Sequence, residues 1–358
     1  MPSTLKCPVC GGDLNFNPKG QNWKCEYCDY TGTEADVAKF SAEAKQDPDK
    51  AADAGKREVS TDGDVTVTYK CAYCGAEVIT TEDTAQTFCI YCQRPVTILS
   101  QVTGEFKPAL VLPFRMVKDD ALKQFKNFLQ GKRFLPDAYC GDKNVDKLSG
   151  IYVPFWLFDG TMHFDFSGEG DIVSVRREGD FQIRQTDTYA ITRKGSIGAE
   201  NVPVDASSRI PDDIMDSIEP FKYEDLKQFS TPYLSGFLAQ RFDVSKEDSF
   251  PRAKKRMEGS VDKHIASTLG KYSSVRPSRD EKTVDNVEGV YGLLPIWMLY
   301  STFEGENYIF AMNGQTGKML GNLPMDSKKV TKYRLMAFLF GGIGSALLGL
   351  LLYAMELF

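Results

Sequence analysis

The feature that most constrains this chain is a duplicated set of paired cysteines in its N-terminal third. The first set comprises Cys7, Cys10, Cys25 and Cys28, and the second, shifted by 64 residues, comprises Cys71, Cys74, Cys89 and Cys92. In each set, fourteen residues separate two C-x-x-C pairs. Four thiolates suit a closed, tetrahedral zinc site, and the segment between the pairs has room for a small hairpin. The spacing therefore predicts two zinc ribbons, each holding one zinc ion.

The ligand types predict structural rather than catalytic zinc. A catalytic zinc site keeps one position open and usually draws on histidine or carboxylate ligands, whereas each set here is closed by four sulfurs. The chain has only two histidines, His163 and His264, and no H-E-x-x-H motif. A redox pair would be a single C-x-x-C in a βαβ setting, which the sequence lacks. The ninth cysteine, Cys140, has no basic neighbour and is expected to be an ordinary thiol.

Charge argues against nucleic acid as the ligand of the ribbons. The chain carries 43 Lys and Arg against 49 Asp and Glu, a formal net charge of −6. Within residues 1–30 three lysines are balanced by three carboxylates, and residues 70–98 carry a net charge of −1. Phosphate binding needs clustered cations. Tyr27, Tyr73 and Tyr91, each preceding the second cysteine of a pair, are thus expected to pack the metal loops or face a protein rather than stack on bases.

A long apolar run near the C-terminus predicts a membrane span. Residues 335–355 contain no charged side chain. As a helix they reach about 31 Å, enough for a hydrocarbon core of about 30 Å. The run is preceded by Lys328, Lys329, Lys332 and Arg334, and only Glu356, Leu357 and Phe358 follow it. This charge bias predicts a tail-anchored, single-pass protein of the cell membrane with its N-terminal part in the cytoplasm, where thiols stay reduced and free to bind metal.

The same apolar run carries a stripe of small residues. Ala337, Gly341, Ser345 and Gly349 recur every four residues and therefore share one side of a helix. Such a stripe lets a second helix approach closely, which is how membrane helices gain packing energy. Glycine is also simply common in membrane helices, so both interpretations stay open.

The remaining sequence divides into a linker and a larger domain. Residues 33–66, between the expected ribbons at 1–32 and 67–100, are charged and poor in large apolar side chains, which predicts a short helix followed by a flexible linker. Residues 105–326 contain runs typical of strands separated by runs typical of helices. This pattern favours an α+β fold with an antiparallel sheet, giving a multidomain chain that ends in the membrane helix at 335–355.

Several elements of the α+β domain can be predicted. "DDALKQFKNFLQGK" and "SFPRAKKRMEGSVDKHIASTL" are expected to be helices, and "IYVPFWLFDGTMHFDF" and "IVSVRREGDFQIRQTDTYAITRKG" strands joined by glycine-rich turns. Asn313-Gly314 is expected to form a hairpin turn. "NGQTGK" is not a phosphate-binding loop, because Met312 stands where the first glycine is required and Met319 replaces Ser or Thr. We predict no catalytic or cofactor-binding residue, and hence no enzyme.

The order of these motifs resembles a family of bacterial membrane proteins. Two four-cysteine ribbons are followed by "LVLPF", "FLPDAY", "YVPFW", "TPYLSGFLAQRFD", "NGQTGK" and the C-terminal apolar run. This arrangement is similar to that of proteins labelled TFIIB-type zinc-ribbon proteins. The resemblance implies an adaptor that recruits a flotillin-like SPFH-domain protein to the membrane, together with a second membrane protein, in an oligomeric complex linked to envelope stress. It assigns no partner-binding residue.

Two alternatives stay open on the residues alone. One is a membrane-tethered nucleic-acid-binding ribbon protein, which the charge disfavours and which a salt-sensitive shift of DNA or RNA would support. The other is an enzyme with an unrecognised site in the α+β domain, which would require a pocket with clustered carboxylates of strongly shifted pKa.

Overall fold

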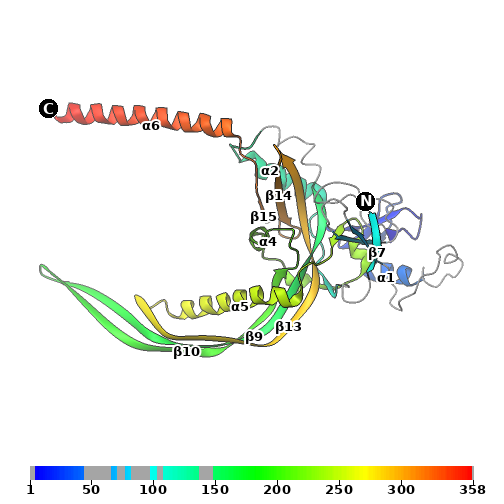
Figure 1. The fold of residues 1–358 in the computed structure, drawn as a ribbon, viewed down its shortest axis with the longest axis horizontal. Coiled ribbons are helices and arrows are strands. Elements are labelled where there is room, and N and C mark those ends of the chain that lie inside the picture. Colours follow the sequence, from blue (N-terminus) through cyan, green and yellow to red (C-terminus); the bar gives the residue numbers. More distant parts are fainter. Residues whose placement is uncertain are drawn as a thin grey trace.

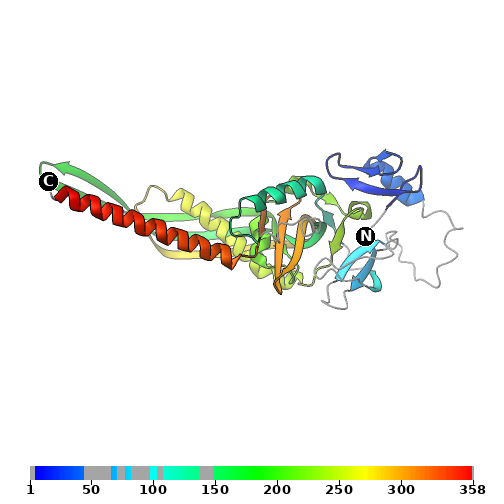
Figure 2. The same ribbon diagram turned by 90° about the horizontal axis from the view of Figure 1, so that it is seen from above.

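The computed structural model describes residues 5–43, 66–70, 77–81, 97–102, 108–136 and 148–356. Figure 1 shows a central body that carries a small N-terminal ribbon at one end. A long, curved arm of strands and the C-terminal helix α6 (Ser327–Glu356) leave the body at the other end. The view from above shows the arm and α6 extending in the same general direction (Figure 2).

The N-terminal ribbon is a four-stranded antiparallel sheet. Its strands are β1 (Leu5–Lys6), β2 (Asp13–Asn17), β3 (Asn22–Cys25) and β4 (Thr31–Gly32), in sequential order. The hairpin expected between the first two cysteine pairs is β2–β3. Helix α1 (Glu34–Glu43) follows, at the place where the sequence predicts a short helix.

The body is built on one mixed sheet. Its strands are β5 (Thr66–Lys70), β6 (Glu77–Thr81), β7 (Thr97–Val102), β8 (Leu110–Val111), β9 (Ser149–Glu178), β10 (Phe181–Asp205), β11 (Lys227–Gln228), β12 (Leu238–Gln240), β13 (Ser274–Phe303), β14 (Glu306–Asn313) and β15 (Met319–Gly321). The main order is β11-β8-β13-β9-β12-β6-β5-β7, with β10 beside β9, β14 beside β13, and β15 beside β14. Of the described strand pairs, β12–β9 and β13–β8 are parallel and the others antiparallel. The α+β class is confirmed, with a mixed sheet in place of a wholly antiparallel one.

Helices cover both faces of this sheet. The predicted helices are α2 (Lys118–Gln130) and α5 (Lys246–Thr268), and both contribute to the core on one face. The short helix α4 (Asp212–Ile218) contributes to the core on the other face. Successive side chains of a strand point to opposite faces, so the even-numbered Tyr152 joins the first core and the odd-numbered Val153 the second. Because both faces are covered, β9 is buried without alternation over residues 151–158.

The arm consists of β9, β10 and β13 (Figure 1). Along the arm, the burial of successive β9 side chains alternates strictly. Met162, Phe164 and Phe166 are buried, and the residues between them are only partly buried. Helix α5 packs against β9 and β10 here. Strand β13 begins at Ser274, opposite Asp171, so the outermost part of the arm is the β9–β10 hairpin alone.

The glycine-rich turn expected between the two arm sequences is wrong, because β9 runs unbroken through Gly160, Gly168 and Gly170. The glycine turn within the second sequence does form, since Gly179, with a φ of 60°, lies between the end of β9 and the start of β10. A Cβ on Gly168 would clash with the carbonyl oxygen of Arg276 and lie 2.9 Å from the Cα of Pro277. The β9–β13 register shifts at this point, between Pro277 and Arg279. Glycine is required here for the close approach of two backbones and not for a turn.

The turns near the end of the body also differ in detail from the prediction. Strands β13 and β14 are joined at Glu304-Gly305, where both residues have positive φ, of 52° and 86°. Residues 314–318 connect β14 to β15, and Gly317 supplies the positive φ in this loop. Asn313 ends β14, and its side-chain amide donates hydrogen bonds to the carbonyl oxygens of Ile218, the last residue of α4, and of Pro220, rather than forming a two-residue turn.

The expected membrane span at 335–355 falls within α6, whose side chains at Ile343 and over 346–356 lie outside those that the structure describes. Within the described part of the chain, we find no helix with the combined length and apolar character needed to cross a bilayer. The span remains a prediction from the sequence.

Candidate metal centre

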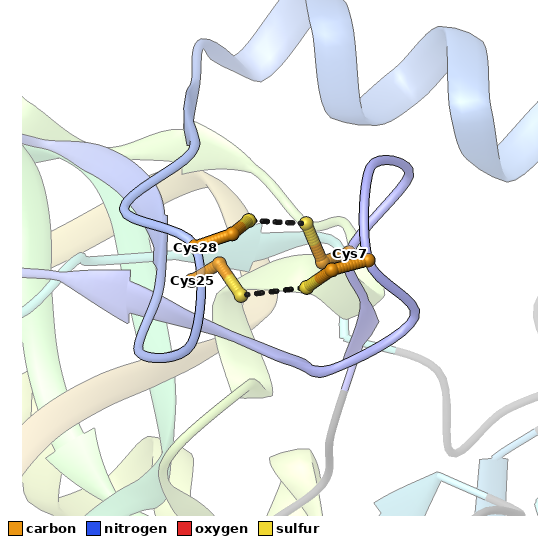
Figure 3. A group of neighbouring side chains, drawn as sticks. Cys7, Cys25 and Cys28 are labelled. Carbon is orange, nitrogen blue, oxygen red and sulfur yellow. Dashed lines mark hydrogen bonds between the residues drawn. The ribbon is translucent and has the colours of Figure 1, made fainter.

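Cys7, Cys10, Cys25 and Cys28 come together at one end of the N-terminal ribbon (Figure 3). Their sulfurs all lie within 4.8 Å of one another, and the Cys7–Cys28 and Cys10–Cys25 pairs are each 3.6 Å apart. These separations are far from the roughly 2.05 Å of a disulfide bond. They are close to the edge of about 3.8 Å of a tetrahedron with 2.3 Å zinc–sulfur bonds. The cluster can therefore hold a metal ion, and its four sulfurs suit zinc.

A tight turn holds each cysteine pair. The N–H of Cys7 donates to the carbonyl oxygen of Gly12 at 2.7 Å, and Gly11 has a φ of 72°. In the second turn, the N–H of Cys25 donates to Tyr30 at 2.9 Å, and Asp29 has a φ of 57°. The residue after the second cysteine is thus left-handed in both turns, a conformation in which glycine is unstrained and aspartate is tolerated.

The crowding of four thiols separates their pKa values. Burial raises the pKa of Cys7, but hydrogen bonds from the backbone at Cys10 and Val9 outweigh this effect and lower it to about 7. A hydrogen bond from the backbone of Tyr30 lowers the pKa of Cys28, yet the neighbouring thiols and burial together raise it to about 12. Four thiolates therefore do not form together at neutral pH without a cation, and a bound metal ion would supply that charge.

The N-terminal ribbon of strands β1 to β4, called the metal ribbon from here on, is docked on the body through aromatic side chains. The sequence analysis did not predict this docking. Phe16 and Trp23 pack against Tyr233 of the short 3-10 turn η4 (Thr231–Leu234), with ring centroids 5.4 and 5.2 Å apart. The hydroxyl of Ser235 donates to the carbonyl oxygen of Leu14. The sequence did contain one signal of this docking, the tryptophan itself. A ribbon of this size has too little core of its own to enclose so large a side chain.

Two exposed lysines of the metal ribbon, which could attract a phosphate group, are paired with carboxylates. Lys19 pairs with Asp120 at 2.8 Å, and Lys24 pairs with Asp29 at 2.9 Å. Tyr27 remains 75% exposed, with its ring close to Gly12 of the other metal-binding turn. Lys19 and Lys24 therefore each have a carboxylate partner.

The second predicted set, Cys71, Cys74, Cys89 and Cys92, lies outside the described residues. Of the described strands in that segment, β5 lies between β6 and β7 and pairs with both. Strand β6 also pairs with β12, with Ala239 opposite Ile79, so these strands extend the sheet of the body.

A second cluster of ionisable groups, which the sequence did not predict, joins β10, α4 and α5. Arg252 of α5 donates to Asp205 at 2.6 Å and also contacts Asp216, while Arg256 donates to Glu219 at 2.7 Å. Burial raises the pKa of Asp205 to about 6, although Arg252 lowers it, and burial likewise raises the pKa of Glu219. Each of these carboxylates faces an arginine, so the cluster fixes the two helices against the end of β10.

Comparison with known proteins aligns most of the chain with one relative. Uncharacterized protein YdjG of Bacillus subtilis (strain 168) is 31% identical over 337 residues, which cover 93% of each chain. No family model matches the sequence, and no solved structure matches it.

Proposed function

We propose that this chain, which belongs to the family of Bacillus subtilis YdjG, is a tail-anchored membrane adaptor. Its metal ribbon, body and arm present binding surfaces in the cytoplasm, and α6 holds them at the cell membrane. Its partners are a flotillin-like SPFH-domain protein and a second membrane protein. This choice of partners comes from the resemblance of the motifs to TFIIB-type zinc-ribbon proteins.

The observation that carries the proposal is the exposed apolar surface of α6. Leu335, Phe338, Leu339 and Phe340 are between 53 and 79% exposed. Moving one such side chain from water into apolar surroundings is worth about 1.5–3 kcal/mol. Helix α6 projects away from the body (Figure 1), and the uncharged run at 335–355 has the length of a hydrocarbon core. A bilayer is the environment that suits these side chains best.

The metal loops favour a protein partner over nucleic acid. Val9 and Tyr27 lie on the two metal-binding turns and are 69 and 75% exposed. Exposed apolar and aromatic side chains on a rigid support are typical of protein-binding surfaces. The neighbouring Lys24 has the Asp29 carboxylate beside it, which weakens its attraction for a phosphate.

We also propose that the chain binds two structural zinc ions. The set at Cys71, Cys74, Cys89 and Cys92 repeats the spacing of the set whose sulfurs cluster around a common point. Equal spacing allows the same pair of metal-binding turns and the same hairpin between them. The second zinc ion would stabilise the segment that contains β5, β6 and β7.

The anchor can be tested by fractionation. The full chain should sediment with membranes and resist extraction by alkaline carbonate, whereas a chain ending at Arg334 should be released. As a matched control, an unrelated leucine-rich segment of equal length in place of 335–355 should restore membrane retention. Extraction of the full chain by carbonate would show that α6 does not span the bilayer.

The adaptor role can be tested by affinity purification from detergent-solubilised membranes, followed by mass spectrometry. An SPFH-domain protein and a second membrane protein should be recovered with the full chain. The variant with the replaced span separates recruitment by the cytoplasmic part from recruitment through α6. Recovery of neither partner would contradict the adaptor. Recovery of nucleic acid that is lost at high salt would support the nucleic-acid-binding alternative instead.

A further inference from the structure

A pocket of about 360 Å³ lies where α6 joins the body. One wall is the loop at 131–135, which follows α2, and the other is the segment at 323–325, which precedes α6. Leu135 is buried in this lining, while Phe134 and Met325 are 40 and 73% exposed. The pocket therefore combines a buried apolar lining with apolar side chains that face solvent.

Specific contacts hold this pocket to the base of α6. The Lys329 ammonium donates to the carbonyl oxygen of Leu135 at 2.8 Å, and the N–H of Asp326 donates to that of Phe134 at 2.8 Å. The ring of Phe134 also packs edge to face against Tyr333 of α6, with centroids 5.3 Å apart. The pocket and the first turns of α6 therefore form one unit, and any membrane contact of α6 also positions the pocket.

The surroundings of the pocket are strongly cationic, although the chain as a whole is acidic. Residues 131–136 and 323–334 together carry six cations, Lys132, Arg133, Lys328, Lys329, Lys332 and Arg334, against one carboxylate, Asp326. This carboxylate caps α6 by accepting the N–H groups of Lys328 and Lys329, at 2.9 and 3.2 Å. Lys132 and Arg133 are exposed and belong to the wall of the pocket.

We propose that this pocket binds the headgroup of an anionic phospholipid in the leaflet that α6 enters. The inference rests on the proposed membrane anchor, because it needs the pocket to lie at the level of the headgroups. Phe134 of the pocket wall contacts Tyr333, two residues before residue 335, where the apolar run begins. Lys132 and Arg133 pair with the lipid phosphate, Phe134 and Met325 contact the upper acyl chains, and Tyr333 lies at the interface, where aromatic side chains are favoured.

The proposal can be tested with the full chain in lipid nanodiscs made of equal parts phosphatidylcholine and phosphatidylglycerol. Native mass spectrometry then measures the ratio of the two lipids that stay bound to the released protein. The wild-type chain should retain phosphatidylglycerol preferentially, and Lys132→Gln with Arg133→Gln should reduce this preference by roughly tenfold or more. Lys254→Gln with Lys255→Gln on α5 removes the same charge far from the pocket and should leave the ratio unchanged.

The outcomes separate this proposal from the membrane anchor. Failure of the chain to enter neutral phosphatidylcholine nanodiscs would overturn both. Entry without a preference for phosphatidylglycerol, or a preference that survives Lys132→Gln with Arg133→Gln, would overturn the headgroup site alone. The charge-conserving pair Lys132→Arg with Arg133→Lys should keep the preference, and its loss would point to a structural role of these residues instead.

Discussion

The indole N–H of Trp23 donates a hydrogen bond to the carbonyl oxygen of Pro232, 2.9 Å away. The bond joins strand β3 of the metal ribbon to a segment 209 residues later in the chain. Trp23 is 1% exposed and lies in one continuous core with residues of the body. The metal ribbon is therefore part of the folded body, and the stability of one depends on the other.

Two substitutions of Trp23 separate packing from hydrogen bonding. Trp23→Ala should lower the free energy of unfolding by about 3–5 kcal/mol, because a large buried ring is lost. Trp23→Phe keeps much of that ring and removes one of the two donors to the Pro232 carbonyl oxygen, which still accepts the N–H of Ser235, so the lost hydrogen bond should cost about 0.5–1.5 kcal/mol. Denaturant unfolding gives both values, and limited proteolysis shows whether the ribbon detaches. Equal unfolding midpoints for Trp23→Ala and the wild type would rule out docking through this ring.

Loss of a metal ligand should unfold the metal ribbon. Cys7→Ser should lower the zinc content by one ion per chain, because metal binding supplies most of the folding free energy of such a module. Metal analysis of the purified protein measures this. Cys140→Ser, which removes a thiol outside both cysteine sets, is the matched control and should leave the zinc content unchanged. A wild-type zinc content in Cys7→Ser would exclude this cluster as the ligand set.

Gly168 should be far less tolerant of a methyl group than a second glycine in the arm. Gly168→Ala pushes a Cβ into the backbone of β13 and should cost about 1–3 kcal/mol. Gly198→Ala in β10 is the control, since a Cβ there meets nothing within 4 Å. Thermal unfolding of both variants makes the comparison. Similar melting temperatures would mean that β9 and β13 are not closely paired at Pro277.

Ionisation of Asp205 should lower the free energy of unfolding as the pH rises from about 4 to 6. Burial raises its pKa from 3.8 to about 6, so in this window the folded protein keeps a proton that the unfolded chain has lost. The resulting loss of stability is at most about 3 kcal/mol and is complete above the folded pKa. Asp205→Asn cannot titrate, so the difference in unfolding free energy between wild type and variant should show this slope. Parallel curves across that range would mean that the carboxyl is not buried as described.

The small-residue stripe on α6 can be tested by replacing two of its small side chains with larger ones. The hydroxyl of Ser345 donates to the carbonyl oxygen of Gly341 at 2.8 Å, and a Cβ on Gly341 would meet no atom within 4 Å. Gly341→Leu with Ser345→Leu should therefore leave α6 helical and membrane insertion intact, but weaken assembly with a partner helix. Cross-linking and co-purification measure assembly, with Leu339→Phe and Leu350→Phe on the opposite side as the control. Unchanged assembly would assign the complex to the cytoplasmic part.

The sequence by itself determined the first metal cluster and the two long helices of the body, α2 and α5. The ligand pairs Cys7–Cys10 and Cys25–Cys28 each lie within one turn, so their spacing already contains most of the geometry of the site. Helices α2 and α5 follow from the spacing of apolar residues, because a helix side is set by neighbours three and four positions apart. These features depend on short-range relationships that can be read along the chain.

Only the tertiary structure decided the path of β9 and the position of the metal ribbon. A glycine such as Gly168 suits both a turn and the close approach of another strand. The residues next to it in the sequence do not show which of these two roles it has. The partner of Trp23 is equally invisible in the sequence, because Pro232 meets it only after the sheet has brought distant segments together. The same holds for Asp205 and Arg252, whose pairing depends on where α5 packs against β10. Contacts of this kind are set by the packing of the whole body, which no local pattern contains.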